Sequence, residues 1–301
     1  MLTVLRVVAA LGLLAVLGGS FVPMFGPWPG DMIAPFRVQL GLAALAGLGV
    51  ALALRDRRVI GLAGIVVVAT GLPMALRLID RPILPDVAEG RAISLVFANV
   101  LVDNRSFDRV TALARAQNAD IFAAAETTGD WVAALGGLKD LYPYSFAPDD
   151  LGLFGVALYA KRPFLAALQL VGRRQMPLLR ADFGDMIVYV AHPMPPASER
   201  LTADNRDYLS ALADLVRAET LPVVLAGDLN STLWSANIEP LLQLGMQWPA
   251  GSGMVYSWPV GRPWMAIQID QVLGLGMKAG QYRVLTDIGS DHYPVRADLV
   301  M

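Results

Sequence analysis

The sequence of 301 residues contains no cysteine and only two histidines. The absence of cysteine excludes disulfide bonds, thiolate nucleophiles and cysteine-built metal sites, and it is compatible with an oxidising exterior without proving one. Charged residues make up only 17% of the chain, whereas hydrophobic residues make up 55%. This composition is too apolar for an ordinary soluble protein, so part of the chain is expected to lie in a membrane.

The apolar residues are concentrated in the first 81 positions, where three long runs cover residues 4–22, 32–54 and 59–78. A helix needs about 20 apolar residues to cross a bilayer, and the second run reaches this length only when residues 32–36 are included and Arg37 snorkels. We therefore predict that residues 1–80 form three transmembrane helices. A cleavable signal peptide is the alternative for the first run, although no convincing cleavage site follows it.

The arginines of this region predict an orientation. Arg55, Arg57 and Arg58 separate the second and third runs, and the positive-inside rule places such a loop in the cytoplasm. The third helix then leads out of the cytoplasm. Arg77 and Arg81, at the far end of this helix, argue against that orientation under the same rule. We expect a multi-pass protein of the inner or plasma membrane, with the residues after about 82 on the periplasmic or extracellular side.

Residues 81–90 contain two prolines and mixed charges, which predicts a linker to a single domain of residues 91–301. In that domain acidic residues outnumber basic ones and no basic stripe is visible, which argues modestly against a nucleic-acid partner. Strand and helix patterns alternate, which predicts sheets covered by helices. The predicted strands are residues 93–98, 121–125, 153–160, 186–191, 222–226, 267–273 and 295–299, and the predicted helices are 107–117 and 206–218.

Polar residues with catalytic potential recur at, beside or within the predicted strands. They are Asn99, Glu126, His192, Asp228, Asn230, Asp270, Asp291 and His292. Taken singly, each has a structural explanation as a turn residue, a helix cap or a satisfied histidine. Their repetition is harder to explain in this way, because burying a charge without a partner costs several kcal/mol. Such groups are expected to converge, and a shared cation would compensate their charge.

The chemistry of the set fits hydrolysis of a phosphoester. Oxygen ligands such as Glu126, Asn99 and Asp291 suit Mg²⁺ or Mn²⁺ rather than a softer metal. A carboxylate such as Asp228 can orient or deprotonate an attacking water, and Asn230 can hold that water or a phosphate oxygen. The two imidazoles can donate hydrogen bonds to phosphoryl oxygens.

The chain contains an ordered set of residues and motifs: Asn99, Glu126, HPMPP, GDLNST, IDQVL and GSDHYPV. On this set, and over about residues 91–301, the chain resembles the endonuclease/exonuclease/phosphatase superfamily, which has a deoxyribonuclease-like fold and membrane-anchored bacterial members. The resemblance implies an α/β four-layer sandwich of two mixed β-sheets flanked by helices. It also implies a role for each residue: Glu126 as main metal ligand with Asn99 and Asp291 beside it, Asp228 and Asn230 on the nucleophilic water, His192 and His292 on the phosphate, and Asp270 orienting His292.

The chain departs from the family pattern at three points. It lacks the glutamine that commonly precedes the metal-binding glutamate, it has Gln271 where membrane-anchored members often have histidine, and it offers no evident acid to orient His192. These departures concern efficiency and substrate more than the class of reaction.

We therefore predict a membrane-anchored phosphoesterase that depends on Mg²⁺ or Mn²⁺, with lipid head groups or small phosphoesters slightly favoured over nucleic acid as substrates. The alternatives are an extracytoplasmic nuclease and a catalytically silent domain that binds phosphorylated ligands. Silent relatives usually lose residues of the Asp228, Asn230 and His292 type, which this chain retains. Trp258 and Trp264 could form an aromatic wall or a membrane-surface contact, although core packing is the commoner role of tryptophan.

Overall fold

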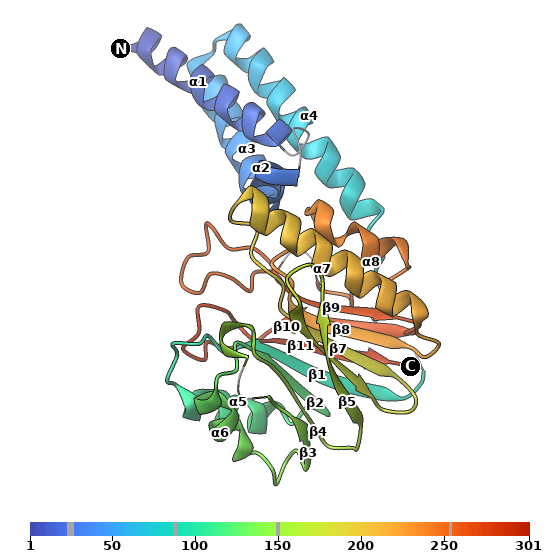
Figure 1. The fold of residues 1–301 in the computed structure, drawn as a ribbon. Helices are drawn as coiled ribbons and strands as arrows, with labels where there is room; N and C mark the ends of the chain where they lie inside the picture. The colour runs from blue at the N-terminus through green and yellow to red at the C-terminus, as the bar shows by residue number, and fades with distance from the viewer. Residues whose placement is uncertain (23–26, 87–88, 149–150, 253–254) are drawn as a thin grey trace.

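The computed structural model describes residues 1–22, 27–86, 89–148, 151–252 and 255–301. Three long helices project from one end of an α/β sandwich (Figure 1). The helices are α1 (Leu2–Phe21), α2 (Pro27–Ile33), α3 (Arg37–Leu54), α4 (Arg57–Ile79), α5 (Phe107–Gln117), α6 (Gly129–Gly136), α7 (Glu199–Ala218) and α8 (Glu239–Gln243). The strands are β1 (Ala92–Asn99), β2 (Ile121–Ala125), β3 (Tyr144–Phe146), β4 (Val156–Ala160), β5 (Leu165–Val171), β6 (Met176–Asp182), β7 (Ile187–Ala191), β8 (Val223–Asp228), β9 (Asp270–Leu275), β10 (Ala279–Val284) and β11 (Val295–Val300).

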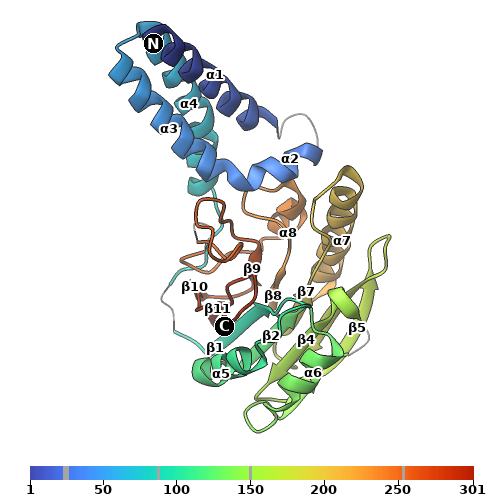
Figure 2. The same ribbon diagram turned by 90° about the vertical axis from the view of Figure 1, so that its left-hand side faces the viewer.

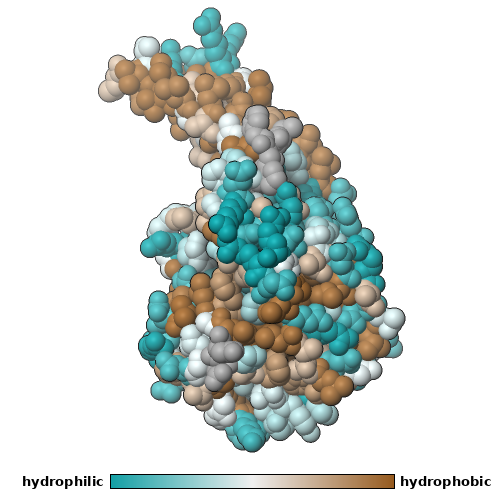
Figure 3. Space-filling model, viewed as in Figure 1, coloured by the Kyte–Doolittle hydropathy of each residue, from teal (hydrophilic) through white to brown (hydrophobic). Residues whose placement is uncertain are grey.

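The helical projection, α1 to α4, contains three helical segments that are long and apolar enough to cross a membrane, as predicted. Its outer surface is largely hydrophobic in Figure 3, and large apolar side chains such as Leu11, Leu45 and Ile65 are more than half exposed. Small side chains, including Ala44 and Ala63, are fully buried where the helices meet. An apolar exterior around a small-residue interface is typical of helices that pack in lipid.

The second of these segments covers Trp28–Leu54 and so includes residues 32–36, but it is not one regular α-helix. A 3₁₀ turn at Ala34–Phe36 separates α2 from α3, and Pro35 lies within it. Proline lacks the N–H of a helical hydrogen bond and its ring clashes with the preceding turn, so the chain bends here. We call residues 31–36, which join the end of α2 to the start of α3, the elbow.

The sandwich consists of two mixed sheets. The first has the strand order β10-β11-β1-β2-β4-β3, and the second has the order β5-β6-β7-β8-β9. Within the first sheet β1 and β2 are parallel, and within the second β7 and β8 are parallel, while the other pairs are antiparallel. Each sheet therefore has one place where the carboxyl ends of two neighbouring strands lie side by side.

Alternate residues of the central strands point into different cores, as the period of a strand requires. Leu95 of β1 and Val224 of β8 belong to the core between the sheets. Val96 belongs to a second core beneath α5 and α6, and Leu225 to a third beneath α7 and α8. Figures 1 and 2 show these helix pairs on opposite outer faces, which confirms the four-layer sandwich.

Several predicted boundaries were wrong. The run 153–160 begins with a 3₁₀ turn and forms strand only from Val156, and the run 267–273 forms strand only from Asp270. Helix α7 begins at Glu199 rather than at 206, because the side chain of Ser198 accepts a hydrogen bond from the N–H of Leu201 and caps a polar first turn. Strands β3, β5, β6 and β10 were not predicted.

The helical projection is bonded to the sandwich at several points. Asp31 of the elbow accepts a hydrogen bond from the N–H of Ala236 at 2.9 Å, and Gln39 of α3 donates to the carbonyl of Ala266 at 2.9 Å. Arg77 of α4 donates to the carbonyl of Leu233 at 3.1 Å. These bonds fix the base of the projection against the sandwich.

The predicted linker also contacts the sandwich. The N–H of Leu84 donates to the carbonyl of Trp248, and the N–H of Trp248 donates to the carbonyl of Pro82. Leu84 is 1% exposed and belongs to the core between the sheets. Residues 82–84 therefore pack as part of the sandwich.

Candidate active site

The carboxyl ends of β1 and β2 bring Asn99 and Glu126 together. Asn99 lies opposite Ala125 in the parallel register, so Glu126 follows one position further on. Asn99 Nδ2 donates to Glu126 Oε1 at 3.0 Å, and the N–H of Val102 donates to Glu126 Oε2 at 2.9 Å. Two donors thus fix a buried carboxylate at the end of the first sheet.

The second sheet contributes His192, Asp228 and Asp270. Ala191 lies opposite Gly227 in the parallel pair of β7 and β8, so His192 and Asp228 follow at the same edge. Gly227 is required for this approach, because a Cβ at its position would lie 2.1 Å from the carbonyl oxygen of Ala191. Asp270 lies opposite Asp228 in the antiparallel register with β9.

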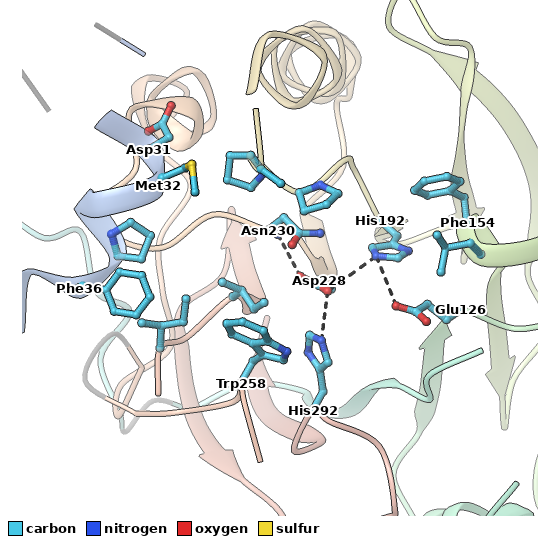
Figure 4. Close-up of a pocket in the computed structure, with 17 residues that line it drawn as sticks. Asp31, Met32, Phe36, Glu126, Phe154, His192, Asp228, Asn230, Trp258 and His292 are labelled. Carbon is cyan, nitrogen blue, oxygen red and sulfur yellow. Dashed lines mark hydrogen bonds and ion pairs between the residues drawn. The ribbon is translucent and has the colours of Figure 1, made fainter. Parts of the chain in front are cut away.

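The two sheets meet at the carboxylate of Asp228, which lies at the centre of the site (Figure 4). Its Oδ2 accepts a hydrogen bond from Asn99 Nδ2 at 3.1 Å, and its Oδ1 accepts from the N–H of Asn230 at 3.0 Å. The same Oδ2 lies 3.6 Å from His292 Nε2 and 3.7 Å from His192 Nε2. Burial raises the pKa of Asp228, and the two imidazoles oppose this shift.

Asp270 holds the ring of His292. His292 Nδ1 lies 2.9 Å from Asp270 Oδ2, which leaves Nε2 directed towards Asp228. Burial alone would lower the pKa of His292, but the charges of Asp270 and Asp228 raise it to about 10. The ring therefore carries a positive charge at neutral pH and presents an N–H at Nε2.

His192 has a different environment. Its Nε2 lies 3.9 Å from Glu126 Oε1, and its ring centroid lies 5.6 Å from that of Phe154. Among the described residues, no carboxylate lies within hydrogen-bond distance of its Nδ1. Burial lowers the pKa of His192 more than the charge of Asp228 raises it. The two imidazoles of the site thus have opposite pKa shifts, upward for His292 and downward for His192.

Two residues of the site hold unusual backbone conformations. Glu126 has a φ of 61° and Asn230 has a φ of 50°. Such left-handed conformations cost about 1–3 kcal/mol for residues other than glycine and are concentrated at functional sites. The side-chain bonds of Glu126 and the bond from Asn230 Nδ2 to the carbonyl of Pro193, at 3.1 Å, hold both turns in place.

The charge balance of the site fits a divalent cation. Glu126 and Asp228 are buried, and in the described part of the chain neither has a lysine or arginine within ion-pair distance. Their oxygens are the hard donors that Mg²⁺ and Mn²⁺ prefer. A second possible set of ligands consists of Asp228, Asp270 and His292, whose ligand atoms lie within 4.8 Å of one another. In this set, however, the carboxylate of Asp270 is already bonded to His292 Nδ1.

Asp291 lies at the rim of the site rather than among the buried residues. Its side chain is 48% exposed, and its Oδ1 lies 3.9 Å from His292 Nε2. Its Oδ2 accepts a hydrogen bond from Trp258 Nε1 at 2.9 Å. The structure therefore brings seven of the eight predicted residues into one cluster and places the eighth beside it.

A pocket of about 380 Å³ lies over Asp228 (Figure 4). Its polar part is formed by Glu126, His192, Asp228, Asn230 and His292. The elbow contributes a further wall, formed by Asp31, Met32, Pro35 and Phe36. Sequence reasoning missed this wall, because no local pattern relates the elbow to strands that begin only at Ala92.

An α/β sandwich of two mixed sheets, with carboxylates, amides and imidazoles converging at one end of the strands, is the deoxyribonuclease-like architecture. The sequence profile of the Endonuclease/Exonuclease/phosphatase family matches residues 96–292, and this chain belongs to that family. The matched segment contains all eight candidate residues, from Asn99 to His292.

Solved structures share this fold. The truncated TDP2 of Caenorhabditis elegans superposes with a TM-score of 0.54 and 16% identity, covering 70% of this chain and 98% of that one. Sphingomyelinase C from Streptomyces griseocarneus superposes with a TM-score of 0.53 and 16% identity, covering 69% and 99%. No curated protein sequence matches the chain. At this identity the superpositions show the fold alone.

Proposed function

We propose that this chain is a membrane-anchored phosphoesterase that depends on a divalent metal ion. The observation that carries the proposal is the carboxylate of Asp228, placed between two imidazoles and a hydrogen-bonding amide in a pocket. A carboxylate held among several hydrogen-bond donors beside a pocket can position a water for in-line displacement at phosphorus, while the donors stabilise the charge that develops on the phosphate.

Each residue has a part in this reaction. Asp228 orients the attacking water and takes its proton, and Asn230 holds the water in line. His292, fixed by Asp270, and His192 donate hydrogen bonds to the phosphoryl oxygens. These donors stabilise the charge that develops on the phosphate during the displacement.

Glu126 is the proposed main ligand of the metal, with Asn99 and Asp291 beside it. When bound, Mg²⁺ or Mn²⁺ would neutralise negative charge on the phosphate and compensate the buried carboxylates. Asn99 Nδ2 donates to both Glu126 and Asp228, so it also holds these two carboxylates at a fixed separation.

The proposal is tested with the full-length protein in detergent micelles and a panel of phosphoesters in Mg²⁺. The panel contains bis(p-nitrophenyl) phosphate, p-nitrophenyl phosphate, mixed phospholipids, RNA and duplex DNA. We expect a lipid or small phosphoester to give a higher kcat/KM than duplex DNA, since no lysine or arginine is among the described residues that line the pocket. A highest value for DNA or RNA would indicate a nuclease, and no turnover of any substrate would indicate a silent binding domain.

We further propose that the helical projection spans the inner or plasma membrane with the sandwich outside the cytoplasm. Arg55 lies in the turn between α3 and α4, and Arg57 and Arg58 begin α4, at the end of the projection remote from the sandwich (Figure 1). Alkaline phosphatase fused after Gly90 should therefore be active in a bacterial host, and the same reporter fused after Asp56 should be inactive. The reverse pattern would place the sandwich in the cytoplasm.

A further inference from the structure

The pocket over Asp228 has two unlike ends. One end holds the carboxylates, amide and imidazoles described above. The other end is formed by the elbow, with the apolar side chains of Met32, Pro35 and Phe36. Further apolar lining comes from Ile267 and Ile269 before β9 and from Leu153 before β4, while Phe154 lies beside His192 at the polar end (Figure 4). Hydrolysis of a free phosphate ester needs only the polar end, so the apolar end is surplus to the chemistry.

The elbow wall is held in place by specific contacts. Asp31 is 2% exposed, and its Oδ1 accepts from the N–H of Ala236 while its Oδ2 lies 3.8 Å from a guanidinium nitrogen of Arg206. The bond from Gln39 to Ala266 fixes the start of α3, just after Phe36 and next to Ile267. Met32 nevertheless remains 40% exposed, so an apolar side chain is presented to the pocket rather than packed away.

The position of this wall indicates what it meets. The elbow leads directly into α3, whose apolar surface is proposed to lie in the bilayer. Figure 4 shows Met32 and Phe36 on the side of the pocket opposite Phe154 and Glu126, with Asp228 between them. An apolar group entering beside α3 would therefore pass the elbow before reaching the catalytic carboxylate.

We infer that the substrate is a phosphoester bearing an apolar chain, which lies against Met32 and Phe36 while its phosphate lies at Asp228. The inference rests on the proposed phosphoesterase function and adds the substrate class. A pocket of about 380 Å³ falls within the range of small-ligand sites, which bury most of their ligand in largely apolar surroundings. The elbow thus serves as a determinant of specificity.

The test compares substrates that differ only in their chain. p-Nitrophenyl octyl phosphate is compared with p-nitrophenyl methyl phosphate, and octyl phosphate with methyl phosphate, using the full-length protein in micelles with Mg²⁺. We expect kcat/KM to be at least about tenfold higher for the octyl member of the pair that is cleaved, since burial of a few methylene groups is sufficient for that factor. Met32→Ala and Phe36→Ala should each lower the octyl-to-methyl ratio by about threefold or more.

Leu42→Ala is the matched control, because Leu42 lies on α3 with 61% exposure and does not line the pocket. It should leave the ratio unchanged, and the smaller replacement Phe36→Leu should give an intermediate ratio. Cleavage of the methyl ester without an octyl preference, or a preference that the elbow variants do not change, would overturn the inference and leave the phosphoesterase standing. If none of these esters is cleaved but another member of the phosphoester panel is, the inference is wrong and the phosphoesterase stands. If no substrate of either set is cleaved, both the phosphoesterase and the inference are wrong.

Discussion

Replacing Asp228 with alanine should lower kcat by about three orders of magnitude or more, equivalent to roughly 4 kcal/mol of transition-state stabilisation. The carboxylate accepts hydrogen bonds from Asn99 and from the N–H of Asn230, and both imidazoles lie within 3.7 Å of it. Its proposed role is exerted on the attacking water, so the loss should appear in kcat more than in KM. Steady-state kinetics with the best substrate of the panel measures the effect.

Asp204→Asn is the control for the loss of a buried aspartate. Asp204 on α7 has a side-chain exposure of 3% and pairs with Arg173 and Arg174, neither of which is a candidate residue. This variant should keep kcat within about twofold of the parent value, whatever it does to stability. A loss of less than about tenfold on Asp228→Ala would mean that Asp228 only closes the turn after β8.

Removal of the metal should have the second large effect. EDTA should reduce hydrolysis to the background rate, and added Mg²⁺ or Mn²⁺ should restore it. Glu126→Gln keeps the shape of the side chain but removes its charge, so the Mg²⁺ concentration for half-maximal activity should rise by about 100-fold. Even the outer partners of metal ligands typically contribute 10–100-fold to affinity.

Glu219→Gln is the matched glutamate control. Its carboxylate accepts hydrogen bonds from Arg180 and from the hydroxyl of Tyr189, at the opposite end of the second sheet from Asp228. The variant should lower the melting temperature and leave the Mg²⁺ requirement unchanged. Full activity of the parent protein in EDTA would remove the metal from the mechanism.

The polar cluster could be predicted because its signal is local. In β1, β2, β7 and β8 a continuous buried run stops at a polar residue, and parallel pairing then aligns those ends without any further information. His192 and Asp228 follow the buried runs of β7 and β8, so their positions in the sequence are enough to predict that they lie close together. The helical projection was equally visible, because the length of an apolar run is a property of the sequence alone.

The remaining elements depend on contacts between distant residues. Strand β5 is an edge strand with mixed exposure, and its partner β6 contains Pro177, so neither shows a clear alternating pattern. The elbow is a similar case, because Asp31 and Ala236 are 205 positions apart. Neither the edge pairing nor the apolar wall of the pocket follows from any short stretch of residues.

The bonds between the helical projection and the sandwich also limit how such a chain can be recombined. A helix that serves only as a tether can be exchanged for any other of suitable length. Here an exchange would leave the N–H of Ala236 without its acceptor and would remove Met32 and Phe36 from the pocket. A hybrid made by grafting this sandwich onto a foreign anchor would therefore begin with an incomplete cavity.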